Sequence, residues 1–226
     1  RPAAADFVRV LATWAVGAFH IWQQSWYGGA APAHWLRAGS VGVDLLVMLS
    51  AFCLFLPWAN AAVRDQPLPR IRPAEFYRRR ALRLLPAYYV SLLFSLVLAV
   101  ARRGWSKALA LDLAAHLALT QQLYRPAYLA CQLNGVAWTL TVFALFYLVF
   151  PLLASLCAKW PLPTLAALGL VQLGYTCWLL PQYGSGDYSA RFNQLPAFSG
   201  VLAVGLAAAW VFAKFAHGGW AQHVLP

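Results

Sequence analysis

Two ionisable side chains, Arg9 and His20, interrupt the apolar segment that opens the chain, residues 7–22. Their eleven-residue offset is close to three whole helical turns, so both lie on one face of a helix, separated by about 16 Å of rise. Ionisable groups on an apolar helix of this kind are costly and usually face a protein interior or a water-filled cavity. The pair therefore indicates a functional site with a cation at one depth and an imidazole at another. The alternative is that Arg9 extends to a lipid headgroup and His20 is an ordinary buried histidine.

A second candidate site is the arginine-rich run that begins at Phe76. Arg80 and Arg83 are i,i+3 neighbours on a helix, and Arg79 and Arg83 are the i,i+4 alternative. Paired guanidiniums at the mouth of a helix bundle are suited to bidentate capture of phosphate. The alternative is that these arginines fix membrane topology or contact lipid headgroups.

Acidic residues are rare inside the apolar segments, where only Asp44 and Asp112 are expected. Asp44 could orient His20 and stabilise its protonated form, a pairing that makes an imidazole an effective general base. Gly39 and Gly42, just before it, would let two helix backbones approach closely. The alternative for Asp44 is a favourable position in the dipole at a helix start.

Asp112 and His116 are spaced i,i+4 and could form a second acid/base pair, although an interfacial location explains them equally well. The four cysteines are scattered, with no CxxC pairing, so we interpret them as small hydrophobic residues and expect no disulfide framework and no metal site. These are Cys53, Cys131, Cys157 and Cys177.

The elements that must position these residues are transmembrane helices. The 226 residues are 62% hydrophobic and only 10% charged, far more apolar than a soluble domain. The net charge of +11 does not indicate nucleic-acid binding, because seven of the 17 Lys and Arg residues lie between positions 63 and 83. A basic segment between apolar ones is typical of a cytoplasmic loop.

Apolar runs long enough, or nearly long enough, to span a bilayer predict an all-α fold, a polytopic bundle of about seven transmembrane helices. The first and fourth runs are short enough to be tilted or partly interfacial. If the basic loop is cytoplasmic, the first helix runs outward and the joint at 23–40 lies outside. The runs are 7–22, 41–62, 84–101, 108–123, 136–158, 162–180 and 195–215.

Five motifs, in order along nearly the whole chain, resemble those of the acyltransferase-3 family of integral membrane acyltransferases. The order of the motifs carries the resemblance, because no single one is specific. They are Arg9-x10-His20; Gly42-Val43-Asp44 through Ser50-Ala51-Phe52; Arg80-Ala81-Leu82-Arg83 with Pro86 and Tyr88; Trp138-Thr139-Leu140 with Tyr147 and Pro151; and Arg191 with Leu195-Pro196-Ala197-Phe198-Ser199-Gly200. Two positions differ from the family, Phe143 in place of its usual Glu and Ala51 in place of its usual Gly.

The resemblance implies transfer of an acyl group, most often acetyl, from cytoplasmic acyl-CoA to a hydroxyl of a carbohydrate or related acceptor. Under that reading His20 is the general base, Asp44 its orienting partner, and Arg9 contacts the donor or the developing oxyanion. The remaining roles are coenzyme A phosphate binding by Arg80, Arg83 and Arg79, and substrate binding by Trp138 and Ser50.

We expect residues 1–226 to form one membrane acyltransferase domain, incomplete at its C-terminus because family members generally have more helices. The expected setting is a bacterial inner membrane, as a multi-pass protein. Expected partners are acetyl-CoA or another acyl-CoA as donor, a carbohydrate or glycolipid acceptor and the lipid bilayer, with no metal and no nucleic acid. The alternatives are a transporter or flippase, in which Arg9, His20 and Asp44 line a substrate path, and a catalytically inactive membrane subunit.

Overall fold

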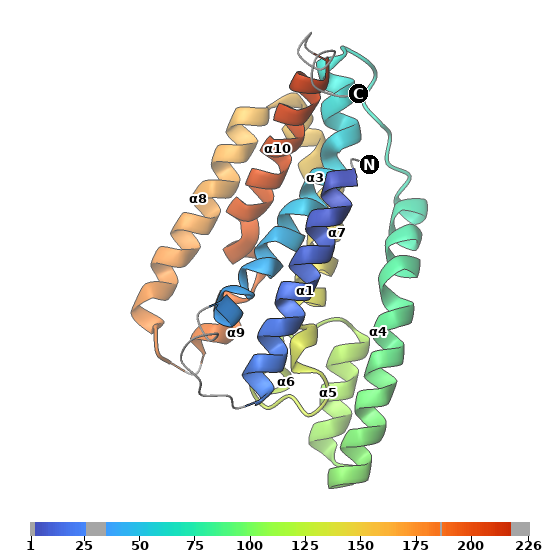
Figure 1. Cartoon of the computed structure of the whole chain (residues 1–226), viewed down its shortest axis with the longest axis vertical. Helices are drawn as coiled ribbons and strands as arrows, with labels where there is room; N and C mark the ends of the chain where they lie inside the picture. Colours follow the sequence, from blue (N-terminus) through green and yellow to red (C-terminus); the bar gives the residue numbers. More distant parts are fainter. Residues whose placement is uncertain (1–2, 26–34, 186, 218–226) are drawn as a thin grey trace. The chain divides into compact units, whose positions relative to one another are not determined.

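A computed structural model describes residues 3–25, 35–185 and 187–217, and this part of the chain is helical with no β-strand. Six helices in the described ranges are long and apolar enough to cross a membrane: α1, α3, α4, α7, α8 and α10 (Figure 1). The predicted all-α, polytopic bundle is confirmed. The long helices are α1 (Ala3–Ser25), α3 (Val41–Val63), α4 (Pro73–Arg103), α7 (Trp138–Lys159), α8 (Pro161–Leu179) and α10 (Ser199–His217). The shorter ones are α5 (Lys107–Leu117), α6 (Arg125–Leu129), α9 (Tyr188–Phe192) and the 3-10 turns η1 (Gly135–Ala137), η2 (Leu180–Gln182) and η3 (Leu195–Phe198).

The chain forms two compact units, each built from segments that are distant in sequence. Unit 1 comprises Arg1–Pro69, Leu153–Leu173 and Phe198–Pro226, and unit 2 comprises Arg70–Leu152 and Gly174–Ala197.

In unit 1, small residues let α3 pack closely on α1. A Cβ atom added at Gly42 would lie 2.6 Å from the carbonyl oxygen of Ala12 and 2.8 Å from the side chain of Val16. One added at Gly39 would collide with the carbonyl oxygen of Ala15. The close approach predicted for these glycines is confirmed. Residues 26–34 of the joint between the two helices lie outside the described residues.

The helix α3 also packs against α10 within unit 1 (Figure 1). A Cβ atom at Gly205 would collide with the backbone of Met48, so this contact too requires a glycine, which has no side chain. Next to it, the rings of Phe55 and Trp210 lie 6.2 Å apart between centroids. Apolar helices meet without a hydrophobic driving force in lipid, so close backbone packing of this kind supplies the association energy.

In unit 2, α4 and α7 run antiparallel along each other. The rings of Phe76, near the start of α4, and Phe150, just past the middle of α7, are stacked with centroids 5.7 Å apart. Further along α4, Tyr88 and Leu92 are buried with Ala137, which directly precedes α7. The pairing therefore covers the part of α7 that belongs to unit 2.

The helix α5 is shorter than the predicted apolar run at 108–123, because it ends at Leu117. Leu119 adopts a positive φ of 56°, and the N–H of Thr120 donates to the carbonyl oxygen of Ala115 at 2.8 Å. This is the bonding of a Schellman cap, which stops a helix. At 11 residues, α5 is about 16 Å long, roughly half the hydrocarbon thickness of a bilayer.

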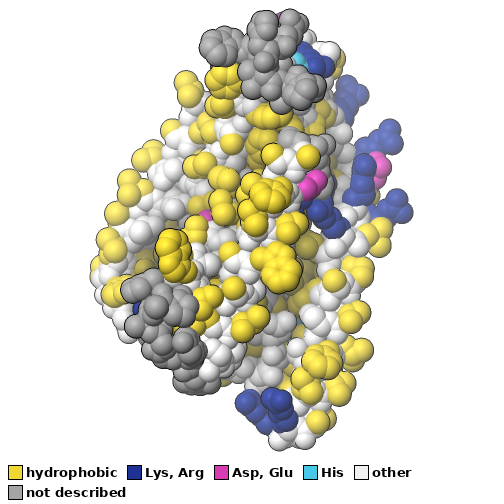
Figure 2. Space-filling view, in the orientation of Figure 1, with side chains coloured by type: hydrophobic (Ala, Val, Ile, Leu, Met, Phe, Trp, Pro, Cys, Tyr) yellow, Lys and Arg dark blue, Asp and Glu magenta, His cyan; other side chains and the backbone are white. Residues whose placement is uncertain are grey.

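The surface of α4 has the distribution expected of a lipid-facing helix. Basic side chains gather near its first turns and again at its far end, with hydrophobic side chains exposed between them (Figure 2). The exposed hydrophobic residues of this stretch include Leu82, Val90, Leu93, Phe94 and Val97.

Candidate functional site

Arg9 and His20 both lie half-buried on α1. Arg9 forms an ion pair of 2.6 Å with Asp6, and its other terminal nitrogen lies 3.6 Å from the sulfur of Cys53 on α3. The Nδ1 atom of His20 lies 3.3 Å from the side-chain oxygen of Gln23. An amide oxygen only accepts hydrogen bonds, so this contact fits the tautomer that carries the imidazole proton on Nδ1 and the lone pair on Nε2. In that tautomer His20 can take a proton through Nε2.

Arg9 also borders a groove of about 630 Å³ along α1. Its other described lining residues are Val10, Thr13, Trp14, Gly17, Ala18 and Ile21, and His20 is not among them. A groove of this kind, apolar with one cation in its wall, suits an alkyl or acyl chain that carries a polar group beside Arg9.

The structure does not bring Asp44 to His20. The contacts of Gly42 with Ala12 and of Gly39 with Ala15 set the register of the antiparallel pair α1 and α3. Asp44 therefore lies opposite α1 near Val10, which is ten residues, or about 15 Å of helix rise, from His20. Asp44 and Ser50 are both half-buried on α3. In the described residues the side-chain partner of His20 is Gln23, not Asp44.

Two of the three predicted phosphate-binding arginines are exposed on α4. Arg83 is exposed, and Arg79 forms a 2.7 Å ion pair with Glu75 in which both side chains are open to solvent. An exposed pair of this kind contributes little to stability and is weakened by salt. The guanidinium of Arg79 can therefore exchange Glu75 for a phosphate at little cost.

Arg80 occupies a different environment, half-buried between α4 and α7. Its guanidinium carbon lies 5.4 Å from the ring centre of Phe76 and 5.9 Å from that of Tyr147. These distances are typical of cation–π contacts. The ring of Phe143, which stands at the family's Glu position, lies 6.2 Å from that of Tyr147. A carboxylate at position 143 would thus be one helical turn from Tyr147, whose ring contacts Arg80.

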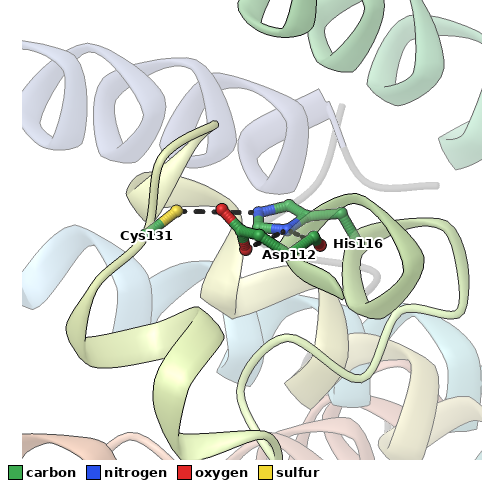
Figure 3. A group of neighbouring side chains, drawn as sticks. All are labelled: Asp112, His116 and Cys131. Carbon is green, nitrogen blue, oxygen red and sulfur yellow. Dashed lines mark hydrogen bonds and ion pairs between the residues drawn. The ribbon is translucent and has the colours of Figure 1, made fainter. Parts of the chain in front are cut away.

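The most tightly built polar cluster in the described residues of unit 2 joins Asp112, His116 and Cys131 (Figure 3). The Nδ1 atom of His116 lies 3.1 Å from the Asp112 carboxylate and 2.9 Å from the Asp112 carbonyl oxygen. Its Nε2 atom lies 3.9 Å from the sulfur of Cys131 and 3.4 Å from the carbonyl oxygen of Asn134. The backbone N–H of Gln132 donates to the second Asp112 oxygen at 2.7 Å.

The electrostatics of the cluster favour a charged imidazole. Burial by itself lowers the pKa of His116, but the hydrogen bonds with Asp112 and Cys131 outweigh it and raise the pKa to about 10. His116 has no exposed surface, and Asp112 is only 3% exposed. A buried pair of this kind is maintained only because each charge offsets the desolvation of the other.

The three side chains could also hold a metal ion, since each offers one ligand atom and these atoms lie within 4.8 Å of one another. However, the Asp112 carboxylate and the Nδ1 atom of His116 already bind each other. A metal would have to compete with that ion pair. The order carboxylate, imidazole, thiol is instead typical of a nucleophile with its proton partner and an orienting acid.

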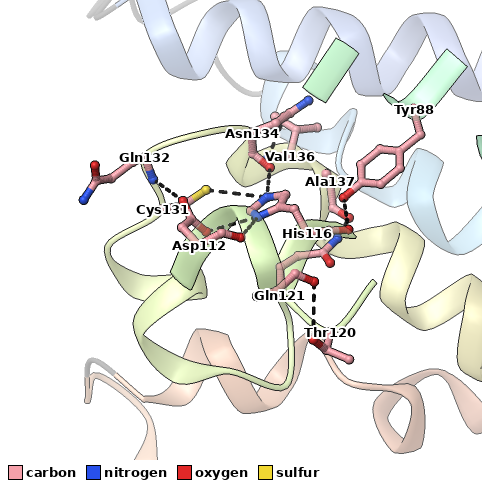
Figure 4. A network of polar contacts seen from close by, with 11 residues as sticks. Tyr88, Asp112, His116, Thr120, Gln121, Cys131, Gln132, Asn134, Val136 and Ala137 are labelled. Carbon is pink, nitrogen blue, oxygen red and sulfur yellow. Dashed lines mark hydrogen bonds and ion pairs between the residues drawn. The ribbon is translucent and has the colours of Figure 1, made fainter. Parts of the chain in front are cut away.

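A cavity of about 10 Å³, room for about one water molecule, adjoins the cluster. Gln121 lines it, and its amide donates to the carbonyl oxygen of Ala137 at 2.8 Å (Figure 4). The side-chain oxygen of Gln121 is buried with no hydrogen-bond partner among the described residues. Trp138 also lines the cavity, and Tyr88 donates to the carbonyl oxygen of His116 at 2.9 Å. The predicted substrate-binding residue Trp138 therefore lies next to the cluster.

Comparison with known proteins identifies the family. The sequence pattern of the acyltransferase domain matches residues 3–222. The chain belongs to the acyltransferase-3 family. It is also similar to Nodulation protein 10 of Rhizobium leguminosarum bv. viciae, with 24% identity over 193 residues that cover 79% of this chain and 50% of the relative. The chain thus spans about half the length of the curated relative it matches, and no solved structure matches it.

Within this acyltransferase-3 chain, the predicted site residues fall into separate groups. Arg9, His20, Asp44 and Ser50 belong to unit 1, and the arginines of α4 and Trp138 belong to unit 2. The spacing of Asp112 and His116 predicted a pair, and the structure pairs them. Cys131 was missed as a site residue. The only signal in the sequence was its position in a short loop fifteen residues after His116, which has no helical periodicity to interpret.

Proposed function

We propose that this acyltransferase-3 chain moves an acyl group, acetyl in the first instance, from acyl-CoA to a hydroxyl of a carbohydrate or glycolipid acceptor at a bacterial inner membrane. The observation that carries the proposal is the match of the acyltransferase domain to residues 3–222, together with six helices able to span a membrane in the described part of the chain. An acyl-CoA donor carries phosphates, so its binding requires a phosphate-binding site. Transfer to a hydroxyl acceptor requires a base that takes the hydroxyl proton.

The arginines at the start of α4 supply the phosphate-binding site in this proposal. Arg79 and Arg83 are exposed, and Arg80 is held on the faces of Phe76 and Tyr147. Guanidiniums bind phosphates through paired, charge-assisted hydrogen bonds. A guanidinium already fixed on aromatic rings loses less conformational entropy when it binds.

His20 supplies the base. Its Nε2 atom takes the proton of the acceptor hydroxyl, the hydroxyl oxygen attacks the acyl carbonyl, and coenzyme A leaves as the thiol. Gln23, rather than Asp44, holds the ring in the required tautomer. About 16 Å of helix rise separates Arg9 from His20, so Arg9 contacts a different part of the substrates from His20.

The experiment that tests this proposal is calorimetric titration of the purified protein in detergent with acetyl-CoA. Wild type should bind, and the double variant Arg80→Ala/Arg83→Ala should bind about tenfold or more weakly for each arginine removed, since a hydrogen bond to a charged group is worth about 1.5–3 kcal/mol. The matched control is Arg102→Ala/Arg103→Ala, which removes two arginines from the other end of the same helix.

Equal binding by the two double variants would return the α4 arginines to a topological role. Absence of binding by folded wild-type protein would contradict acyl transfer and would favour the transport or inactive-subunit alternatives.

A further inference from the structure

Cys131 is a half-exposed thiol in the loop between α6 and η1, and the mechanism above does not use it. Its sulfur lies 3.9 Å from the Nε2 atom of His116. A thiol in contact with an imidazole is the arrangement from which a nucleophilic thiolate forms, with the proton passing to the ring.

The imidazole beside Cys131 is held in one orientation. Its Nδ1 atom binds Asp112, and the N–H of Gln132 holds the Asp112 carboxylate from the other side. Tyr88 binds the backbone of the same histidine. Together these contacts direct Nε2 toward the sulfur, so the nucleophile, its proton partner and the orienting acid are all present.

The arginines lie on the same helix of unit 2 as Tyr88, which contacts the histidine beside the thiol. Tyr88, which binds His116, follows Arg80 by eight residues on α4, or about 12 Å of rise. An extended pantetheine arm can span that distance. A donor whose phosphates bind at Arg80 could therefore present its thioester at the level of His116.

We propose that Cys131 takes the acyl group from acyl-CoA as a covalent S-acyl intermediate before the acceptor receives it. This inference rests on the proposed function. His116 is the proton partner of the thiol, and Asp112 is a positioning residue.

The two half-reactions balance. Cys131 reacts as the thiolate paired with the His116 imidazolium: its sulfur attacks the thioester carbonyl, the bond to the coenzyme A sulfur breaks, and coenzyme A leaves as the thiol with the proton from His116. The acceptor hydroxyl then attacks the S-acyl carbonyl, the bond to the Cys131 sulfur breaks, and the proton that the hydroxyl loses returns to His116, which restores the thiolate and imidazolium pair. Exchange of one thioester for another costs little free energy, so the first half-reaction is readily reversible.

The adjoining cavity limits where the acyl group can lie. At about 10 Å³ it holds a water molecule but no acyl chain. The S-acyl group of the intermediate therefore lies outside this cavity.

A covalent intermediate is tested without knowing the acceptor, through isotope exchange between acetyl-CoA and labelled free coenzyme A. A covalent enzyme intermediate allows this exchange in the absence of acceptor, at a rate above that of the uncatalysed thiol–thioester exchange measured without protein. Wild type should exchange, and peptide mass spectrometry should find a hydroxylamine-sensitive acetyl group on Cys131. Cys131→Ser should reduce exchange to background, and His116→Gln should reduce it about 10²–10⁴-fold.

The matched control is Cys177→Ser, which removes another accessible cysteine and should leave exchange unchanged. Mapping the acetyl group on wild-type protein does not depend on any variant folding. Wild type that binds acetyl-CoA in calorimetry but neither exchanges nor becomes acetylated would overturn the intermediate and leave the proposed function intact. Wild type that does not bind acetyl-CoA would overturn both. Stoichiometric zinc on an unmodified Cys131, with exchange absent, would identify a metal site instead.

Discussion

The two histidines of the candidate sites, His20 on α1 and His116 on α5, are held very differently. His20 is half-buried, and the one contact of its ring nitrogens among the described residues is the 3.3 Å interaction with Gln23 on its own helix. His116 is fully buried, and both of its ring nitrogens contact neighbours from its own helix and from the loop after α6. A loosely held ring can turn to meet an acceptor of variable shape, whereas a fixed ring serves a partner that is always in place.

The acidic neighbours of the two sites show the same contrast. Asp6 pairs with Arg9 on the surface of α1, where its side chain is 56% exposed. Asp112 pairs with His116 out of contact with solvent. An exposed pair contributes little to stability, whereas the loss of one member of a buried pair is expensive. Substitutions at the first site should therefore change activity, and substitutions at the second should change stability as well.

The largest effect should come from His20→Ala. Removal of a positioned general base lowers turnover by about 10²–10⁴-fold, and because His20 is half-exposed the variant should unfold at the wild-type temperature. Acetyl transfer from acetyl-CoA and thermal unfolding in detergent measure the two quantities. Wild-type turnover in this variant would remove His20 from the mechanism.

The second-largest effect should be on stability and concerns the buried pair of Asp112 with His116. Asp112→Ala leaves a buried imidazolium without its counter-charge and should lower the free energy of unfolding by about 3–5 kcal/mol. The matched control Asp6→Ala breaks the exposed pair with Arg9 and should cost no more than about 1 kcal/mol. Similar losses in the two variants would mean that the buried cluster is not the more stabilising one.

The pH dependence of stability should separate the same two variants. The pKa of His116 is raised from 6.5 to about 10 in the folded protein, so its contribution is fully present below pH 6.5 and is lost as the pH rises toward 10. Wild type and Asp6→Ala should therefore lose stability across this range, and Asp112→Ala should lose less. Thermal unfolding in detergent at intervals between these pH values measures the difference, and parallel curves for all three proteins would contradict it.

The smallest effect should come from Gln23→Ala. A single hydrogen bond contributes about 1 kcal/mol, so turnover should fall by roughly fivefold while the unfolding temperature stays the same. The conservative variant Gln23→Glu keeps the acceptor oxygen and should retain turnover. A loss as large as that of His20→Ala would show that the ring is held as rigidly as His116.

The fold was predictable because its signals are local. Long apolar runs become helices that can cross a membrane, and Gly39 and Gly42 become a close contact because glycine leaves no side chain in the way. The end of α5 was not predicted. It depends on Leu119 adopting a left-handed conformation that leucine seldom takes, followed by polar residues that bond to distant backbone.

The sites were predictable only where one helix carries both partners. The i,i+4 spacing of Asp112 and His116 sufficed for that pair. The expected contact of Asp44 with His20 failed because the register of α1 on α3 is set by the glycine contacts, which composition does not reveal. Cys131 reaches His116 through a loop whose path follows from tertiary packing alone.

The short α5 also decides how the chain is threaded through the bilayer. Since α4 and α7 run antiparallel and α5 covers only about half the hydrocarbon thickness, α5 makes no crossing of its own between them. An arrested helix thus sets the parity of every later crossing, because a seventh crossing at α5 would reverse the direction of each helix after it.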